Sequence, residues 1–366
     1  MTKEKLNIIV LARWFVRWNG MSQVVYNLSK ELIENGHNVL VITYKGYADR
    51  EWVQEIPTMR INRSYHNLLS LKDIAELLRE YDADVVHSHG LLGLAAYLSK
   101  KNYIVTYHGN WPMNMFASTS SFLFSFTLLP LSVIEMKKAW KVICVSRFMK
   151  KVLKNAFDID SVFIPNGVNE EIIIDNLDPH KRDDLIVFLG TLSRRKAKYL
   201  IDVIHAINSS SSKRVSVLIA GKIVDKSLYR SLIKIPNVNV LGYVSEKEKL
   251  EILRRSKVVI LPSMAENIPV VVLEAFSQGV PVIAFKVGGL PDVIINGYNG
   301  FLIDRWDVHL FARKTLKIID DLATYMQLAR NAVSFAKRNT WKKIAEKYQK
   351  IYYQMLQQTN IDKTLR

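Results

Sequence analysis

The sequence has little cysteine and lacks the motifs of several common cofactor and metal proteins. Its one cysteine, Cys144, excludes a disulfide within the chain and fits a reducing compartment. No Gly-x-Gly-x-x-Gly motif follows the first expected strand of either half, which argues against a nicotinamide dehydrogenase. His87 and His89 could bind a metal as a pair, but with no third ligand placed we expect packing or polar lining instead. We therefore expect no metal and no resident cofactor.

The sequence also shows no signal peptide and only one long uncharged stretch. The apolar segment 6–12 is short and Arg13 follows it directly, so we expect a first strand and a cytoplasmic chain. Residues 109–134 carry no charge, but Pro112 and Pro130 interrupt them. We expect a buried or cleft-lining helix there, while contact with a membrane surface and a membrane span remain open alternatives.

Positive charge exceeds negative charge. The 51 Lys and Arg residues against 34 Asp and Glu residues give a formal net charge of +17. Such an excess attracts anions such as nucleotide phosphates, nucleic acid or acidic lipid. Because no nucleic-acid-binding motif is recognisable, we expect no nucleic acid partner.

Short apolar runs alternate with amphipathic segments along all 366 residues, a length that fits two domains. The runs are β-branched and apolar on both faces, as buried parallel strands are. They cover 6–12, 38–44, 83–89, 103–109 and 141–146, then 184–190, 214–221, 237–243, 257–263, 281–287 and 300–304. The pattern predicts an α/β fold of two doubly wound, Rossmann-like domains facing across a cleft, with ligands beyond the carboxyl ends of the strands.

Two local signals refine this picture. The first helix is expected over 22–36, with Ser22 as its N-cap and Gly36 as its C-cap. The segment SVFIPNGVN, residues 161–169, contains Pro-Asn-Gly and is interpreted as a turn that leads into the interdomain connection.

The strongest chemical signal lies at 262–294, PSMAENIPVVVLEAFSQGVPVIAFKVGGLPDVI. Glu266 and Glu274 are separated by seven residues, and Asp292 follows a Gly-Gly pair. A helix that begins near Val270 would direct backbone N–H groups at a phosphate, and its carboxylates would bind sugar hydroxyls. Both glutamates could instead be solvated helix charges.

At this point the sequence resembles the retaining, two-Rossmann-domain glycosyltransferases of family 4, which include phosphatidylinositol mannosyltransferases. That family carries Glu-x7-Glu followed by Gly-Gly-x-x-Glu. The resemblance spans nearly the whole chain, because further pieces occur in the family's order: NGMSQVVYNLSKELIENGHNV, VVHSHG, VTYHG, VICVSRF, IPNGV, FLGTLSRRK and LIAG.

The resemblance implies the GT-B fold and a division of labour between domains. Residues 1–165 would be an acceptor-side domain, 166–183 a linker and 184–340 the nucleotide-sugar-binding domain. Residues 341–366 would be a C-terminal helix that packs back on the first domain.

The resemblance also implies a donor-binding site. Its residues would be Gly20, Arg194, Arg195, Lys196, Glu266, Ile268, Val270 and Glu274. Glu274 would bind the ribose, and Lys196 with Arg195 or Arg194 would hold the diphosphate. The catalytic residues would be Lys196, Glu266 beside the transferred sugar, and His108 facing that sugar. A hydrogen-bonded His108 without a role remains an alternative, as does a solvated turn at 194–196.

Several positions depart from the family pattern. Asn19 precedes Gly20 where two glycines are usual, and Thr191 stands where an arginine is usual. Ala197 and Pro269 each replace a glycine, and Asp292 replaces a glutamate. Thr191 removes one phosphate-binding cation unless Arg194 or Arg195 supplies it.

The expected function is therefore retaining, metal-independent transfer of a hexose from a nucleotide diphosphate sugar to a glycan or lipid-linked glycan. We identify no Asp-x-Asp motif of the kind that binds a divalent cation in metal-dependent transferases, so cationic side chains would take that role. Peripheral contact with the anionic inner face of the cell membrane is expected from the basic surface. A sugar-nucleotide epimerase and a non-catalytic donor-binding subunit remain alternatives.

Overall fold

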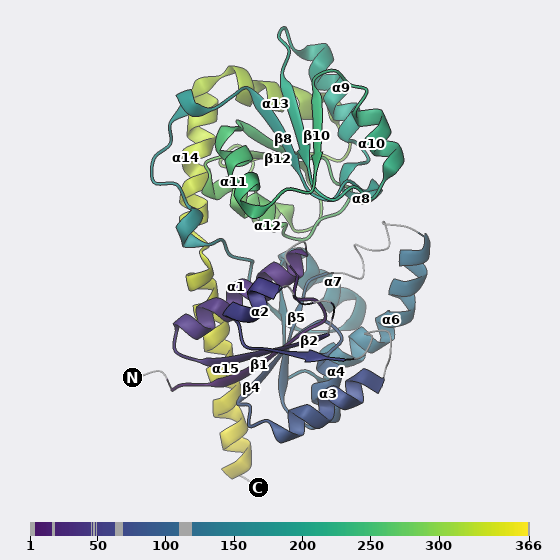
Figure 1. The fold of residues 1–366 in the computed structure, drawn as a ribbon, viewed down its shortest axis with the longest axis vertical. Helices are drawn as coiled ribbons and strands as arrows, with labels where there is room; N and C mark the ends of the chain where they lie inside the picture. The colour runs from purple at the N-terminus through teal and green to yellow at the C-terminus, as the bar shows by residue number, and fades with distance from the viewer. Residues whose placement is uncertain are drawn as a thin grey trace. The chain divides into compact units, whose positions relative to one another are not determined.

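The computed structural model describes residues 4–364 apart from 17–18, 45, 47, 49, 63–68 and 110–118. The chain divides into two compact units. The first holds Leu123–Gly167 and Trp341–Arg366 together with the amino-terminal part of the chain, and the second holds Val168–Thr340. Each unit is an α/β sandwich with helices on both faces of a parallel sheet (Figure 1).

Among the described residues, the sheet of the first unit has the strand order β3-β2-β1-β4-β5-β6-β7, with all neighbours parallel. Its strands are β1 (Asn7–Ala12), β2 (Asn38–Tyr44), β3 (Thr58–Ile61), β4 (Val85–His89), β5 (Tyr103–Tyr107), β6 (Lys141–Cys144) and β7 (Ser161–Phe163). Its helices are α1 (Gly20–Glu34), α2 (Arg50–Glu55), α3 (Leu69–Glu80), α4 (Gly93–Leu98), α6 (Thr119–Lys138), α7 (Arg147–Phe157) and α15 (Trp341–Thr364). The order changes direction between β1 and β4, which is where a doubly wound sheet binds its ligand.

The second sheet has the order β10-β9-β8-β11-β12-β13 among the described residues, again parallel throughout. Its strands are β8 (Leu185–Leu189), β9 (Ser216–Ala220), β10 (Val238–Gly242), β11 (Val258–Leu261), β12 (Val282–Phe285) and β13 (Gly300–Ile303). Its helices are α8 (Arg194–Ala197), α9 (Leu200–Ser210), α10 (Lys226–Leu232), α11 (Glu246–Arg255), α12 (Val270–Ser277), α13 (Val308–Asp320) and α14 (Leu322–Arg338). Its switch point lies between β8 and β11.

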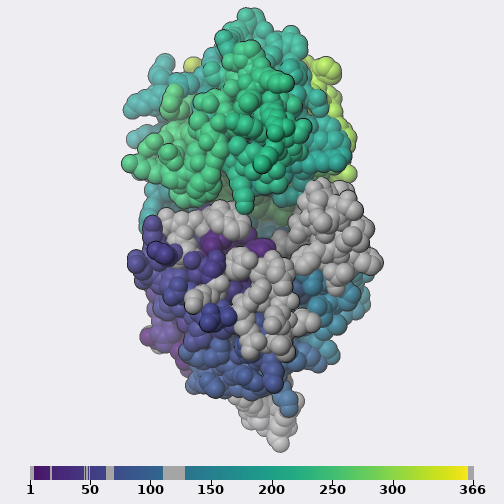
Figure 2. All heavy atoms as spheres, turned by 45° about the vertical axis from the view of Figure 1, so that its right-hand side comes forward, coloured from purple at the N-terminus to yellow at the C-terminus, as the bar shows by residue number. Residues whose placement is uncertain are grey.

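The expected doubly wound halves are confirmed, and two edge strands were missed. β3 and β7 lie at the two edges of the first sheet, and Arg60 and Val162 in them are exposed, so neither reads as a buried apolar run. Edge strand β10 of the second sheet is likewise half-exposed, with Leu241 and Tyr243 open to solvent at its end. Figure 2 shows α10 and β10, teal to green, on the near surface of that unit.

The helix α1 begins earlier than the sequence suggested. Its N-cap is Asn19, whose Oδ1 accepts hydrogen bonds from Met21 N at 2.9 Å and Ser22 N at 3.3 Å. Ser22 is buried inside the helix and donates its hydroxyl to Trp14 O instead. The prediction of Ser22 as N-cap was therefore wrong, because asparagine is an equally strong capping residue and occurs three positions earlier.

The C-terminal helix α15 belongs to the first unit, as the fold prediction requires (Figure 1). Its buried side chains include Trp341, Tyr348 and Tyr352, and it packs against α1. Polar contacts fix its register: Tyr352 OH lies 2.8 Å from His87 Nδ1, and Gln349 Nε2 lies 2.8 Å from His37 Nε2. The helix therefore completes the hydrophobic core of the unit in which the chain begins.

The uncharged stretch 109–134 falls only partly within the described residues, because 110–118 lie outside them. From Thr119 it forms α6, with Pro130 inside the helix. In the part of the chain that the structure describes, no helix combines the length and apolar character needed to cross a membrane.

One buried carboxyl anchors α6 to the sheet. Glu135 is 2% exposed and accepts hydrogen bonds from Gly93 N at 2.7 Å and Ser88 Oγ at 3.1 Å. Burial raises the pKa of Glu135 to about 8, and these two hydrogen bonds partly oppose the shift. The group is thus mostly protonated at neutral pH.

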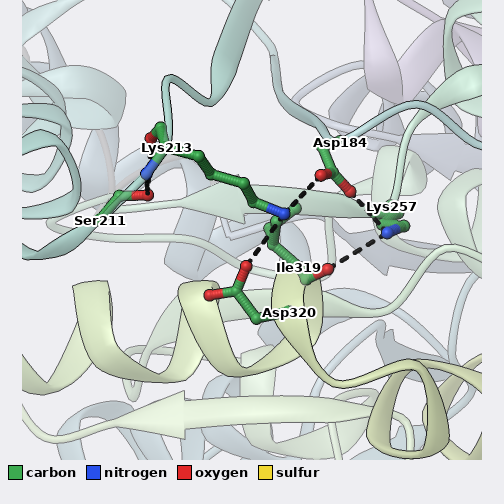
Figure 3. Close-up of polar contacts among 6 residues, drawn as sticks. All are labelled: Asp184, Ser211, Lys213, Lys257, Ile319 and Asp320. Atoms are coloured by element: carbon green, nitrogen blue, oxygen red, sulfur yellow. Dashed lines mark hydrogen bonds and ion pairs between the residues drawn. The ribbon is translucent and has the colours of Figure 1, made fainter.

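The amino edge of the second sheet is closed by an ion-pair network (Figure 3). Asp184, just before β8, accepts from Lys257 at 2.5 Å and from Lys213 at 2.5 Å. Lys213 also pairs with Asp320 at the end of α13, 3.0 Å away, and Lys257 donates to Ile319 O. These contacts join the starts of two central strands to α13 at the edge opposite the expected ligand site.

Candidate functional site

The predicted cations and the first glutamate meet at the switch point of the second sheet. Lys196 and Arg195 lie in α8, which follows β8, and Glu266 lies in the loop that follows the neighbouring β11. Lys196 Nζ is 3.4 Å from Glu266 Oε1, and the Arg195 guanidinium is 3.8 Å from Glu266 Oε2. The arrangement places two positive charges and one negative charge at the carboxyl ends of β8 and β11.

The loop that carries Glu266 is tied to α8 by its backbone. Met264 N donates to Arg195 O at 2.8 Å, and the Arg195 guanidinium donates to Ala265 O at 2.8 Å. Ser263 Oγ lies 3.0 Å from Glu266 Oε1 and 3.2 Å from Lys196 O. Glu266 is only 4% exposed, so it is a fixed and buried carboxylate, and the solvated interpretation is wrong for it.

Helix α12 begins beside this carboxylate. Its N-cap is Pro269, and no side chain among the described residues caps it, so the first-turn amides of Val270 and Val271 lack both an intrahelical acceptor and a capping side-chain oxygen there. Ile268, in the loop that precedes the helix, is 4% exposed. An uncapped helix terminus of this kind attracts an anion through its N–H groups and its dipole.

The second glutamate has a partner that the sequence interpretation missed. Glu274, in the second turn of α12, is 6% exposed and accepts a hydrogen bond from Lys249 Nζ at 2.7 Å. Lys249 Nζ also lies 2.7 Å from Glu246. Burial raises the pKa of Glu274 and the Lys249 ammonium opposes that shift, whereas the two carboxylates raise the pKa of Lys249 against the effect of its own burial. Glu274 is therefore held in place from α11.

A helical periodicity could have revealed Lys249. It lies four residues before Leu253, which is fully buried, so both occupy the inward face of α11. The charged run SEKEKLEILRR conceals this face, because a lysine in such a run is usually solvated.

The three consecutive cations at 194–196 differ in their exposure and in their contacts. Arg195 and Lys196 are each 21% exposed and contact Glu266, whereas Arg194 is exposed on α8. Arg195 is thus the arginine of this run that pairs with Glu266. Close backbone approach supports this corner: a Cβ on Gly221 would lie 2.0 Å from Gly190 O, so only glycine lets the loops after β8 and β9 touch.

The other two predicted residues lie in the first unit. Gly20 is the first residue of α1 and is exposed, and a Cβ there would meet no atom within 4 Å. Asn19, at the position where the family has glycine, already accepts the amides of Met21 and Ser22. The open space at Gly20 could admit a ligand, but those two amides are occupied.

His108 belongs to a cluster of three imidazoles. Its Nε2 lies 2.9 Å from His89 Nδ1, and the rings of His87 and His89 are 4.3 Å apart. Burial lowers the pKa of His108 to about 4 and that of His87 to about 3. Within the described residues no group of three metal-type side chains is arranged to hold an ion, and His87 is instead bonded to Tyr352 and Thr106.

One statement from the sequence needs correction. Two Asp-x-Asp tripeptides do occur, Asp82-Ala83-Asp84 and Asp158-Ile159-Asp160. Asp84 accepts from Asn7 N at the amino end of β1, and Asp158 and Asp160 pair with Lys154 ahead of β7. Both tripeptides thus precede strands, at the edge of the sheet opposite to the one that binds ligands.

Comparisons with known proteins agree with this geometry. Residues 169–335 match the profile of glycosyl transferases group 1, and residues 18–172 match that of glycosyltransferase family 4. An uncharacterised glycosyltransferase of Methanocaldococcus jannaschii is 25% identical over 96% of this chain and 99% of its own length. The GPI3 subunit of phosphatidylinositol N-acetylglucosaminyltransferase from Saccharomyces cerevisiae is 27% identical over 98% of this chain and 84% of its own.

The fold has close structural counterparts. Anabaena HepE, solved in complex with UDP and glucose, has a TM-score of 0.77 and 18% identity, covering 94% of this chain and 99% of its own. Together with the two parallel sheets this establishes the GT-B fold class. Because the two profiles jointly span residues 18–335, the chain belongs to glycosyltransferase family 4.

Proposed function

We propose that this glycosyltransferase moves a hexose from a nucleotide diphosphate sugar to a hydroxyl of a glycan or lipid-linked glycan, with retention and without a metal ion. The observation that carries the proposal is the buried Glu266 between Lys196 and Arg195, beside the uncapped amino end of α12. Cations and N–H groups together suit a pyrophosphate, and a fixed carboxylate suits a sugar hydroxyl. Family membership favours transfer over the epimerase alternative.

Charge development accounts for the catalytic roles. As the bond between the anomeric carbon and the donor phosphate oxygen breaks, negative charge grows on the nucleoside diphosphate. Lys196, Arg195 and the backbone N–H groups at the start of α12 would stabilise that negative charge electrostatically as it develops. The acceptor oxygen bonds to the anomeric carbon on the same face, and its proton passes to the departing phosphate oxygen. Glu266 would hold the transferred sugar, and His108 stays a proposed contact of that sugar on resemblance alone.

Glu274 is the proposed ribose ligand. Lys249 holds its carboxylate through a 2.7 Å hydrogen bond, and a carboxylate has acceptor sites for both ribose hydroxyls in addition to that bond. The complex of HepE with UDP and glucose supports a nucleoside diphosphate as the leaving group.

We further propose a lipid-linked acceptor at an anionic membrane on the cytoplasmic side. The yeast relative is a subunit of phosphatidylinositol N-acetylglucosaminyltransferase, which supports a glycolipid acceptor. In the first unit α7 exposes Phe148 between the cations Arg147, Lys150 and Lys151, a combination that suits an interfacial helix. Flotation with anionic liposomes should carry the protein at low salt, and the Lys150→Glu/Lys151→Glu variant should stay with the soluble fraction. Equal flotation of both proteins would rule this surface out.

A donor panel tests the proposed activity. Purified protein is mixed with each nucleotide diphosphate sugar and candidate acceptors, with and without a chelator, and released nucleoside diphosphate is measured. We expect release with at least one donor and no effect of the chelator. Loss of activity with the chelator would contradict the metal-independent mechanism.

The yeast relative is named as a subunit, which favours one second candidate: a donor-binding subunit that transfers only within an assembly. Donor binding without release across all acceptors would support that candidate. A changed sugar nucleotide in the absence of acceptor would instead indicate an epimerase.

A further inference from the structure

An arginine just before β8 bonds to the carboxyl ends of two helices of the second unit. Arg182 is half-buried. One terminal nitrogen of its guanidinium, Nη1, donates to Leu253 O at 2.7 Å and to Ser256 O at 3.2 Å, at the end of α11. The other, Nη2, donates to Gln278 O at 2.5 Å, at the end of α12. Arg182 therefore joins α11 to α12 through backbone atoms.

The chemistry of a helix end explains why an arginine stands here. The last carbonyls of a helix lack intrahelical donors and carry the negative end of the helix dipole. Leu253, Ser256 and Gln278 are fully buried, so water is a poor substitute for a missing donor. A guanidinium stays charged and holds its N–H groups in one rigid plane. Two carbonyls bonded to different nitrogens of that plane are thus held at a fixed separation.

The bonded carbonyls stand in register with the ion pair of the candidate site. Leu253 follows Lys249 by four residues on α11, and Gln278 follows Glu274 by four residues on α12. Residues four apart lie on the same face of a helix, about one turn from each other. The Lys249–Glu274 contact of 2.7 Å therefore lies about one turn from the Arg182 bridge on both helices. Two such contacts fix the shift of one helix along the other, which a single contact leaves free.

We propose that Arg182 is a positioning residue of the donor site, which sets the register of α11 against α12 so that Glu274 faces both hydroxyls of the donor ribose. The inference rests on the proposed function, in which Glu274 binds the ribose. The substrate feature that Arg182 governs is the 2′-hydroxyl, because a carboxylate held out of register loses one of its two hydroxyl contacts. The diphosphate contacts of Lys196 belong to a different loop and should be kept.

A double-mutant cycle in two backgrounds tests the register without any ligand. Arg182→Met keeps an apolar stem and removes the bridge, while Arg254 Nε still donates to Gln278 Oε1 at 3.1 Å and holds the helix ends near each other. Lys249→Met, Glu274→Gln and their double variant are unfolded in urea with Arg182 and with Arg182→Met. We expect the coupling between Lys249 and Glu274 to fall by at least about half when Arg182 is replaced. Equal coupling in both backgrounds would overturn the proposal.

Nucleotide binding tests the consequence for the ribose. UDP and GDP, and the 2′-deoxy form of each, are titrated calorimetrically into the full-length protein. Wild type should bind at least one ribonucleotide at least about tenfold more tightly than its 2′-deoxy form, the scale of one hydrogen bond to a charged group. In Arg182→Met this ratio should fall at least about threefold. A wild-type ratio in Arg182→Met would also overturn the proposal.

Two control variants separate positioning from a general loss of stability. Ile207→Ala opens a cavity in α9, which packs against α13, so it should lower the urea midpoint and leave the ribose ratio unchanged. Asp183→Asn removes the exposed ion pair of the neighbouring residue with Arg255 and should change neither quantity. An Ile207→Ala ratio that falls as far as that of Arg182→Met would show a merely structural effect and overturn the proposal.

Arg182→Lys keeps the test decisive if Arg182→Met does not fold. Lysine keeps the charge but offers one nitrogen in place of two, so its ribose ratio should lie between those of wild type and a ratio of one. A wild-type ratio in Arg182→Lys would then overturn the proposal. If wild type itself does not distinguish ribose from 2′-deoxyribose, the ribose role of Glu274 in the proposed function fails. The double-mutant cycle then decides alone whether Arg182 sets the register.

Discussion

The ion pair between Lys249 and Glu274 supports the most detailed prediction. Lys249→Met keeps the length and apolar stem of the side chain and removes its charge. The side chains of Lys249 and Glu274 are 15% and 8% exposed, so the substitution leaves a buried carboxylate without its partner. Breaking a buried pair from one side costs about 3–5 kcal/mol of the free energy of unfolding. Because the site is not fully closed to water, we expect about 3 kcal/mol.

The opposite substitution should cost less. Glu274→Gln leaves Lys249 with a second carboxylate, Glu246, 2.7 Å away, and Glu246 is 47% exposed to solvent. We expect about 1–2 kcal/mol for it, and about the same for the double variant as for Lys249→Met alone. The double-mutant cycle should therefore give a coupling free energy of at least about 1 kcal/mol.

The same substitution should act on the donor site. Without Lys249 the ammonium no longer opposes the effect of burial, so the pKa of Glu274 rises further and the neutral carboxyl gains weight over the carboxylate that would bind the ribose. A charge-assisted hydrogen bond is about twice as strong as a neutral one, so the donor KM should rise at least about tenfold at pH 7. The KM should fall again as the pH is raised and Glu274 loses its proton.

Urea denaturation and initial rates of nucleoside diphosphate release measure both effects. Lys247→Met is the matched control, because Lys247 is exposed on the same helix α11. The reasoning is refuted if the effects on unfolding of the two single substitutions simply add in the double variant. It is also refuted if Lys249→Met has the donor KM of the control.

Three further predictions concern other parts of the chain. Arg195→Ala should slow transfer at least about tenfold while Arg194→Ala stays near wild type, because Arg195 contacts Glu266 and Arg194 is exposed to solvent. Equal rates of the two variants would contradict the assignment. The free energy of unfolding of the wild type should fall by about 2 kcal/mol between pH 6.5 and 8. The reason is that folding raises the pKa of Glu135 to about 8, so the folded protein holds a proton that the unfolded chain has already released in this range. Chemical denaturation across the same range should show no such fall for Glu135→Gln. Asp184→Asn should lower the free energy of unfolding by about 1 kcal/mol in dilute buffer and by less in 1 M salt, because the ion pairs of Asp184 with Lys213 and Lys257 are partly exposed. Sugar transfer should be unchanged, because these pairs lie at the edge of the sheet opposite the candidate site. A loss of stability that does not depend on salt would argue against an ionic origin.

The interior strands could be predicted from the sequence because a buried parallel strand is apolar on both faces. Segments such as 38–44 and 257–263 contain the observed strands β2 and β11. Edge strands lack that signature: β7, Ser161–Phe163, was interpreted as part of a turn because Pro-Asn-Gly follows it. The start of α12 at Val270 was predicted from the motif and is confirmed.

The residues of the candidate site that stand in one sequence motif could be predicted, whereas their partners from segments far apart in the sequence could not. Glu266 and Glu274 stand in one motif, and the proposed roles of the nine predicted residues remain predictions. Lys249 reaches Glu274 through the register of α11, and His89 reaches His108 through the pairing of β4 with β5. The Asp-x-Asp error has the same origin, because a tripeptide does not say at which end of a strand it will lie.

The central claim is that Lys196, beside Glu266 and the α12 terminus, holds the pyrophosphate of the donor. Calorimetric titration of UDP and GDP, and of the matching monophosphates, into wild type, Lys196→Ala and the exposed control Lys198→Ala tests it most directly. The account predicts that at least one diphosphate binds wild type and Lys198→Ala equally and Lys196→Ala at least about tenfold more weakly, while monophosphate affinity changes little. Wild-type affinity of Lys196→Ala for that diphosphate would contradict it.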